Sequence, residues 1–294
     1  MNHAANDPDL KAPFDIIEPA RLTTPLVFNS PHSGADYPKS FLAASRLDAL
    51  TLRRSEDAFV DELYSRCVGI GAPLMRANFP RAYLDVSREP FELDPQMFSG
   101  PLPDFVNSRS LRVAGGLGTI PRVVGDAQPI YKSAMPVAEA MARIDRLYKP
   151  YHQALRALLD RAIRQFGVAI LIDCHSMPSH LSEGGAPDFV LGDRFGASAS
   201  GQIVATMEAQ LRQAGYIVRR NKPYAGGFIT EHYGAPAKGI HAVQIEINRR
   251  LYMDESKMSK NAGWSKLCED LYCLAASLAQ HFNLAMIPPA LAAE

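Results

Sequence analysis

The 294-residue sequence has no excess of charge of either sign, because its 31 Lys and Arg residues balance its 31 Asp and Glu residues. A protein without a basic excess has little electrostatic affinity for the phosphates of nucleic acids. The sequence also lacks the Lys/Arg-rich amphipathic segment that binds a membrane surface. We therefore expect a small molecule as the partner, and neither nucleic acid nor membrane. The oligomeric state is not indicated.

Long apolar runs and paired cysteines are also missing. No run approaches the roughly 20 residues of a transmembrane helix, and the N-terminal residues lack the basic and apolar regions of a signal peptide. These absences predict a cytoplasmic protein. The cysteines form no CxxC pair and are expected to be free thiols: Cys67, Cys174, Cys268 and Cys273.

No repeat, low-complexity linker or compositional break divides the chain. We expect one domain over residues 21–285, a flexible N-terminal arm over 1–20 and a tail over 286–294. Residues 90–135 are rich in Pro and Gly and have little periodicity, which predicts a long irregular segment.

Strand-like and helix-like patterns alternate along most of the chain, which predicts an α/β fold with a mainly parallel, mixed central sheet flanked by helices. Strands are expected at 25–30, 72–79, 81–88, 168–176, 188–194, 216–221 and 241–248. Helices are expected at 55–71, with Ser55 as the N-cap, and at 136–166, 199–215 and 261–282. Pro150 should break or kink the second of these helices.

Three of the apolar strands are followed, or ended, by polar residues. His32 lies just past the first strand, His175 lies at the end of the strand 168–176, and Glu246 and Asn248 share one face of the strand 241–248. In open sheets of this class, ligands bind beyond the carboxyl ends of the strands. A carboxylate among Val and Ile residues is costly to bury unpaired, so Glu246 either pairs with a cation or takes part in chemistry.

Two histidines and an acid are the ligands of many catalytic zinc sites. The third ligand would come from the acidic start of the helix expected at 55–71, with Asp57 as the candidate and Glu56 as the substitute. The candidate ligands lie far apart in the sequence, so their spacing does not specify a metal site by itself.

Structural interpretations of the same residues stay open at this point. His175 could be a hydrogen-bonded histidine, His32 a surface loop residue, and Asp57 a partner of the helix dipole. Asp173 could orient a ligand or cap a loop. Further alternatives are a buried ion pair of Glu246 with Arg81 or Arg88, a structural pair of Arg88 with Asp85, and a nucleophilic Cys174.

Six motifs in order resemble the N-formylglutamate amidohydrolase family and, more remotely, the zinc carboxypeptidases. The motifs are SPHSG (30–34), SEDAFVDELY (55–64), RAYLDVSRE (81–89), IDCHSMPS (172–179), YAGGFITEHYG (224–234) and QIEINRRLYMDE (244–255). The resemblance runs from about residue 25 to 280. One departure from the carboxypeptidases matters: Ala35 stands where they have the acidic ligand, three residues after the first histidine.

The resemblance implies a hydrolase that uses one Zn²⁺ per chain to cleave N-formyl-L-glutamate to L-glutamate and formate, as in histidine degradation. His32, Asp57 and His175 would be the metal ligands. Glu246 would be the general base, and His232 would stabilise the oxyanion. Substrate contacts are expected from Arg88, Tyr224, Gly226, Asn248 and Arg249. The alternatives are a zinc hydrolase of another N-acyl amino acid and a non-catalytic binding module.

Overall fold

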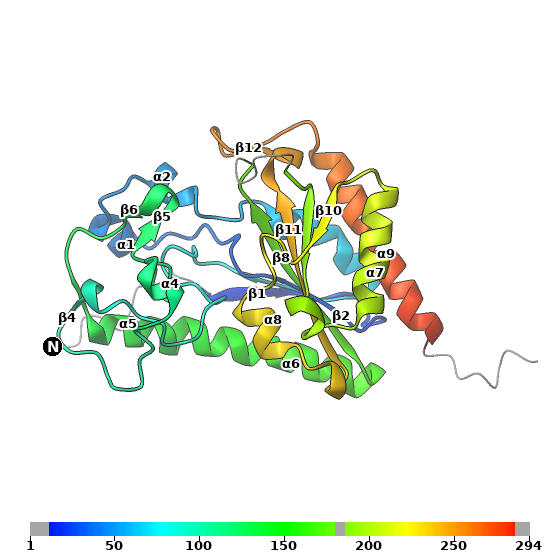
Figure 1. Ribbon diagram of the computed structural model, residues 1–294, viewed down its shortest axis with the longest axis horizontal. Coiled ribbons are helices and arrows are strands. Elements are labelled where there is room, and N and C mark those ends of the chain that lie inside the picture. Colours follow the sequence, from blue (N-terminus) through cyan, green and yellow to red (C-terminus); the bar gives the residue numbers. More distant parts are fainter. Residues whose placement is uncertain (1–11, 180–185, 286–294) are drawn as a thin grey trace, which may run out of the picture. The chain divides into compact units, whose positions relative to one another are not determined.

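The computed structural model of the chain describes residues 12–179 and 186–285. Seven of its strands form one sheet in the order β1-β3-β2-β8-β11-β9-β10 (Figure 1). Their bounds are β1 Phe14–Ile17, β2 Leu26–Ser30, β3 Leu74–Ala77, β8 Ala169–Met177, β9 Phe189–Gly192, β10 Val218–Arg220 and β11 Ile240–Asn248. The β2–β8, β8–β11 and β9–β10 pairs are parallel, whereas β11 and β9 are antiparallel. The predicted α/β fold with a mainly parallel, mixed sheet is confirmed.

Helices flank this sheet, and short strand pairs lie outside it. The helices are α1 Lys39–Ala44, α2 Ala49–Arg53, α3 Val60–Tyr64, α4 Leu111–Ala114, α5 Val137–Arg143, α6 Lys149–Phe166, α7 Gly201–Gln213, α8 Phe228–Tyr233 and α9 Trp264–Ala285. The short strands are β4 Phe98–Ser99, β5 Val123–Val124, β6 Gln128–Pro129, β7 Met135–Pro136, β12 Met253–Asp254 and β13 Ser259–Lys260.

The described residues divide into two compact units, each assembled from separate stretches of chain. The first unit holds residues 12–15, 31–58 and 76–155, and the second holds 16–30, 59–75, 156–179 and 186–285. Within the first unit, residues 90–135 contain only short strands and helical turns. This agrees with the irregular segment that the sequence predicts there. Within the second unit, α7 lies beside α9, and α8 packs on β8 and β11 (Figure 1).

The continuous apolar run at 169–177 explains the central strand. Every residue of β8 is buried, because the strand has a neighbour on each side and is covered on both faces. β11 is almost as completely buried. These two buried strands therefore hold the backbone of the polar residues near their carboxyl ends in fixed positions.

Residues 14–17 form β1, an edge strand of the sheet. The flexible arm predicted over 1–20 is therefore wrong for this stretch, because three of its four residues, Phe14, Ile16 and Ile17, are apolar and all four are partly buried at the edge of the sheet. Residues 1–11 and the tail predicted over 286–294 lie outside the described residues.

The helix expected from Ser55 begins later. Phe59 is its N-cap, with a left-handed φ of 65°, and α3 starts only at Val60. Residues 55–58 are therefore a loop. Asp57 lies in this loop and not in the first turn of α3, whose acids are Asp61 and Glu62.

Two further local expectations fail for identifiable reasons. Residues 81–88 are turns instead of a strand, since Tyr83 N–H donates to the Pro80 carbonyl and Asp85 N–H donates to the Thr119 carbonyl.

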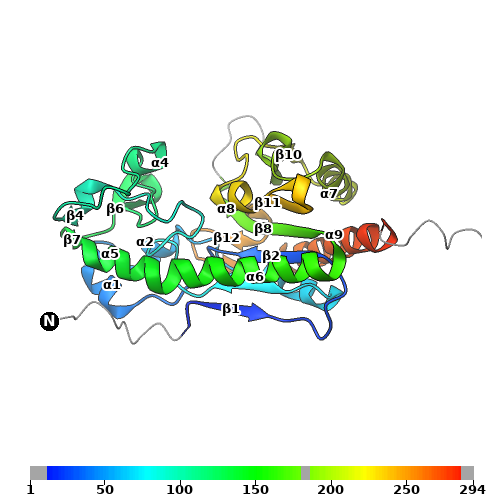
Figure 2. The same cartoon turned by 90° about the horizontal axis from the view of Figure 1, so that it is seen from below.

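Pro150 does not break its helix. The π-helical turn Ile144–Tyr148 precedes it and joins α5 to α6, which run on as one helix in Figure 2. A π turn shifts the backbone register and so accommodates the missing N–H.

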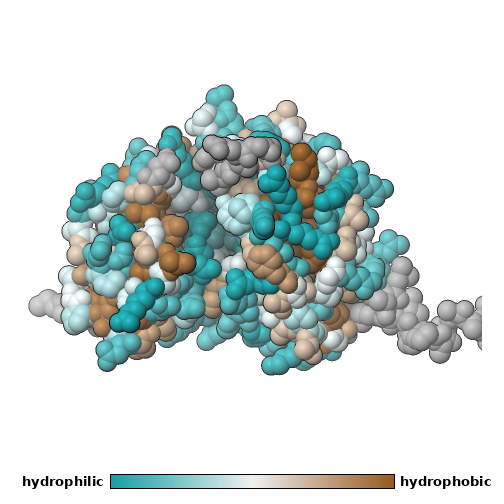
Figure 3. Space-filling model, viewed as in Figure 1, coloured by the Kyte–Doolittle hydropathy of each residue, from teal (hydrophilic) through white to brown (hydrophobic). Residues whose placement is uncertain are grey.

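None of the helices in the described ranges is both long enough and apolar enough to cross a membrane. Hydrophobic and hydrophilic side chains are interspersed over the face drawn in Figure 3. Among the described residues, the large apolar side chains that remain exposed come from separate segments: Leu50, Phe105, Leu111, Leu117, Phe195 and Ile217.

Candidate active site

The register of the two central strands places His175 beside Glu246. These residues are directly paired in the parallel ladder of β8 and β11, and both side chains are buried. A strand alternates its side chains, so Gln244, Glu246 and Asn248 lie on one face of β11. The prediction that polar residues gather at the carboxyl ends of these strands is consistent with this pairing.

His32 and Asp57 are held against each other by their backbones as well as their side chains. His32 follows β2 by two residues, and its carbonyl accepts a hydrogen bond from Asp57 N–H at 3.0 Å. The Ser33 hydroxyl donates to the Asp57 carbonyl at 3.0 Å. The imidazole Nδ1 of His32 lies 3.3 Å from Asp57 Oδ2. Both side chains are buried, so the interpretation of His32 as a surface residue is wrong.

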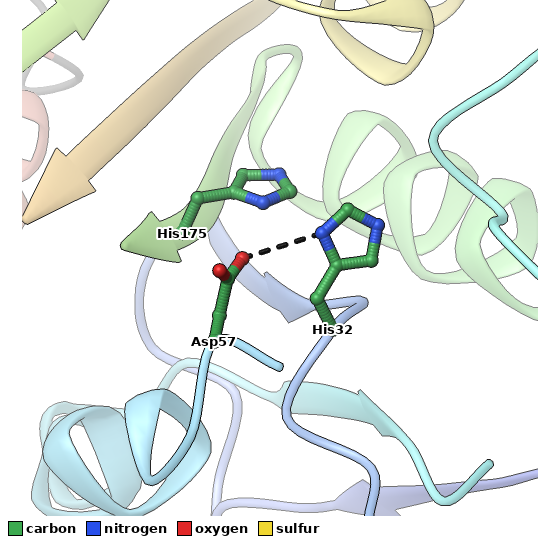
Figure 4. A group of neighbouring side chains, drawn as sticks. All are labelled: His32, Asp57 and His175. Atoms are coloured by element: carbon green, nitrogen blue, oxygen red, sulfur yellow. Dashed lines mark hydrogen bonds and ion pairs between the residues drawn. The ribbon is translucent and has the colours of Figure 1, made fainter. Parts of the chain in front are cut away.

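His32, Asp57 and His175 each offer a ligand atom to one small volume, and these three atoms lie within 4.8 Å of one another (Figure 4). Two donors bound to the same tetrahedral zinc ion are about 3.3 Å apart, given bond lengths near 2.0–2.1 Å. The separation of His32 Nδ1 from Asp57 Oδ2 matches that value. The donor set and this spacing fit a divalent metal ion.

Asp85 fixes the orientation of the His32 ring. Its Oδ1 lies 2.8 Å from Nε2 of His32, on the opposite side of the ring from Asp57. Metal-ligating histidines usually donate their second ring N–H to a carboxylate or carbonyl. Burial opposes the charge on Asp85, but Arg88, His32 and Arg81 outweigh it and hold the pKa of its carboxyl well below the usual range.

Glu56 is engaged elsewhere. Its carboxylate accepts hydrogen bonds from the Tyr37 hydroxyl at 2.7 Å and from Arg53 Nε at 3.2 Å. Of the two acids considered as the third ligand, only Asp57 belongs to the cluster with His32 and His175. The geometry therefore favours Asp57.

The second histidine of the cluster has a carboxylate beside it on its own strand. Asp173 Oδ2 lies 3.0 Å from His175 Nε2, and Asp173 Oδ1 accepts a hydrogen bond from Asn29 Nδ2 at 2.8 Å. Asp173 is thus hydrogen-bonded to β2 and lies against the β8 histidine, a position from which its charge can orient the ring.

Arg249 and Asn248 follow Glu246 and have different surroundings. The buried Arg249 donates from Nε to the hydroxyl of Ser176, the residue after His175, at 3.1 Å. Asn248 uses both ends of its amide on backbone: Oδ1 accepts from Arg250 N–H, and Nδ2 donates to the Pro187 carbonyl. Arg249 is therefore placed as a cation near β8, whereas Asn248 fastens the end of β11.

Arg88 contacts the network around His32. Its guanidinium donates to the carbonyls of Leu117 and Ser87 and lies 3.5 Å from Asp85 Oδ2. These contacts support the structural interpretation of Arg88 as a partner of Asp85. Arg81 lies against the same carboxylate, with its Nη2 2.9 Å from Asp85 Oδ2.

The segment 224–233 carries three more predicted site residues. Gly226 has a φ of 109°, and a Cβ there would lie 2.5 Å from the Thr230 hydroxyl, so the position requires glycine. Tyr224 is half-buried. His232 lies on α8, where its ring is largely exposed and stacks on that of Phe228. The neighbours that cover part of the ring, and then the charge of Arg156, lower its pKa. A neutral imidazole can donate a hydrogen bond, as the oxyanion role requires.

Cys174 points away from this chemistry. Its thiol is fully buried, and burial, followed by the nearby charge of Asp173, raises its pKa well above the usual range. A nucleophilic cysteine needs the opposite shift. The structure therefore disfavours the cysteine-nucleophile interpretation.

Fold and side-chain cluster together define a class: α/β proteins in which histidine and carboxylate side chains meet near the carboxyl ends of a mainly parallel sheet. The model of the N-formylglutamate amidohydrolase family matches residues 24–253. N-formylglutamate deformylase of Pseudomonas putida is 32% identical over 239 residues, which cover 79% of this chain and 83% of that protein. The Pseudomonas aeruginosa protein of the same name is 32% identical over 82% of this chain and 86% of its own.

Solved structures agree with these relatives. N-formylglutamate amidohydrolase from Ralstonia eutropha JMP134 superposes with a TM-score of 0.88 at 37% identity, and the match covers 93% of this chain and 99% of that one. A protein of Agrobacterium tumefaciens shares the fold, with a TM-score of 0.67 at 18% identity over 92% of this chain and 95% of its own. The chain belongs to the N-formylglutamate amidohydrolase family, and it is a hydrolase that acts on amide bonds.

Proposed function

We propose that the protein hydrolyses the formyl amide of N-formyl-L-glutamate to L-glutamate and formate, with one zinc ion held by His32, Asp57 and His175. The cluster of these three buried side chains beside Glu246 supports the proposal. The names of the related Pseudomonas deformylases support the choice of substrate. The predicted cytoplasmic location and the link to histidine degradation belong to the same proposal.

A bound zinc ion would polarise the formyl carbonyl and lower the pKa of a water molecule at the open coordination position. The chain's own residues supply the rest. Glu246 takes a proton from the attacking water and delivers it to the leaving nitrogen, so that cleavage of the C–N bond releases an amine and formate. His232 on α8 is the proposed donor to the carbonyl oxygen as negative charge develops there.

The substrate carries two carboxylates, which need cations or amide donors. Arg249 is proposed to bind one of them, because this buried cation directly follows Asn248 at the carboxyl end of β11 and donates to the Ser176 hydroxyl near the carboxyl end of β8. Tyr224 and the backbone at Gly226 are proposed to line the same pocket. Arg88 stays a candidate for the second carboxylate, although its contacts with Asp85 favour the structural interpretation.

The proposal is tested by measuring zinc content and formate release from N-formyl-L-glutamate for the wild type and His175→Ala. We expect about one zinc per wild-type chain together with formate release, and loss of both in the variant. Ser198→Ala is the matched control, since it removes a buried hydrogen bond to the Ala242 carbonyl of β11 and leaves the cluster intact. Zinc binding without formate release would contradict the substrate, and a panel of other N-acyl amino acids would then be assayed. Absence of zinc in the active wild type would contradict the metal.

A further inference from the structure

Gln244 lies on the same face of β11 as Glu246 and was not singled out by the sequence patterns. Both ends of its amide are occupied. Its Oε1 accepts a hydrogen bond from Gly227 N–H at 2.7 Å, and its Nε2 donates to Glu246 Oε1 at 2.7 Å. The orientation of the amide is unambiguous, because a backbone N–H can only donate and must therefore face the amide oxygen.

The segment that holds the oxygen end of Gln244 is hydrogen-bonded to Arg194, which follows β9 by two residues. Arg194 N–H donates to the Ala225 carbonyl at 2.7 Å, and the Arg194 guanidinium donates to the Gly226 carbonyl at 3.3 Å. Gly192 of β9 is paired with Gln244 in the antiparallel ladder. A Cβ at Gly192 would lie 2.6 Å from Gly226 N, so this glycine permits the close approach of the segment.

The amide therefore links a fixed backbone segment to one oxygen of the carboxylate. We propose that Gln244 is a positioning residue that holds the carboxylate of Glu246 in the orientation needed for proton transfer. An amide can accept from a backbone N–H and donate to a carboxylate at the same time, as Gln244 does here. The inference rests on the proposed function, in which Glu246 is the general base.

Two nearly isosteric variants separate this proposal from a simple anchoring role. Gln244→Met removes both hydrogen bonds. Gln244→Glu keeps an acceptor for Gly227 N–H but removes the donor to Glu246 and places a like charge beside it. If Gln244 positions the base, both variants lower kcat about 10- to 100-fold, the cost of small errors in catalytic geometry, while KM stays within about threefold. Wild-type kcat in Gln244→Glu, which keeps the acceptor for Gly227 N–H but loses the hydrogen bond to Glu246, overturns the proposal.

A double-mutant cycle gives an independent test. In a Glu246→Gln background there is no base to position, so the further change Gln244→Met should leave the residual kcat unchanged within about twofold. A second full loss would show a structural effect and overturn the proposal. Ser198→Ala, which weakens packing on the same strand, should lower the melting temperature but leave kcat unchanged.

A crystal structure of Gln244→Met distinguishes failure of this inference from failure of the proposed function. A rotated or disordered Glu246 carboxylate supports the positioning role even if the wild type released no formate from N-formyl-L-glutamate. An unchanged carboxylate overturns the positioning role even if formate release confirmed the substrate.

Discussion

The polar residues on β8 and β11 and those in the loops after β2 and around Asp85 are held in place by different means. His175 and Glu246 lie opposite each other because two fully hydrogen-bonded parallel strands set their register. His32 and Asp57 lie on irregular backbone, and their orientation depends on contacts with each other and with Asp85.

This difference has a physical consequence. A strand in the centre of a sheet fixes its side chains through many backbone hydrogen bonds, so losing one side-chain contact changes little. A loop has few such bonds, and a ring such as that of His32 is oriented mainly by its side-chain partners. Asp85 in turn is held by Arg81, Arg88 and the N–H of Ser87. The loop region should therefore be the more sensitive to changes one contact away from the ligands.

The contrast is tested most directly by the two carboxylates that contact the histidines. Asp85→Asn should lower zinc affinity about 10- to 100-fold, the usual cost of losing such a partner. Asp173→Asn should cost clearly less, since β2 and β11 keep His175 in register without it. Competition with a chelator measures both affinities. An equal or larger loss in Asp173→Asn would contradict the distinction between strand and loop.

The sequence patterns predicted the positions of His175 on β8 and Glu246 on β11 better than those of the loop residues. A continuous apolar run that ends in His175, and the alternation that puts Glu246 and Asn248 on one face, depend only on local periodicity. The loop-borne half depends on distant partners. The turns at 81–88 are set by a hydrogen bond from Asp85 to Thr119, and the loop around Asp57 depends on the left-handed backbone of Phe59. No local pattern carries that information.

Gln244 was missed for a different reason. Its position two residues before Glu246 was visible in the alternation of β11, but its partner, Gly227 N–H, comes from a segment whose approach is permitted by Gly192 on another strand. The strand ends and the acidic residues at 56 and 57 suggested His32, Asp57 and His175 as candidate ligands, and the family resemblance implied the same three, whereas their spacing in the sequence specified no metal site.

The two arginines predicted to bind substrate provide a second test of the comparison. Arg249 follows β11, and Arg249→Met should raise KM for N-formyl-L-glutamate roughly 10-fold or more, the worth of a charge-assisted hydrogen bond, with zinc content unchanged. Arg88 belongs to the loop region, and Arg88→Met should weaken zinc binding through Asp85 with a smaller change in KM. Arg250→Met is the control, because Arg250 is exposed and its guanidinium pairs with Asp188. Equal increases in KM for both variants would instead assign Arg88 to the substrate.

The smallest effect is expected at Cys174, which is adjacent to His175 yet faces the opposite side of β8. Burial raises the pKa of its thiol well above 9.0, the value for a free cysteine. A raised pKa keeps the protonated form, so no thiolate accumulates in the folded protein as the pH approaches 9. Cys174→Ala should therefore retain kcat within about twofold, and alkylation of Cys174 by iodoacetamide between pH 7 and 9 should be negligible until the protein unfolds. A large loss of kcat in Cys174→Ala at unchanged zinc content would contradict this assignment, since strand alternation alone separates the thiol from the histidine beside it.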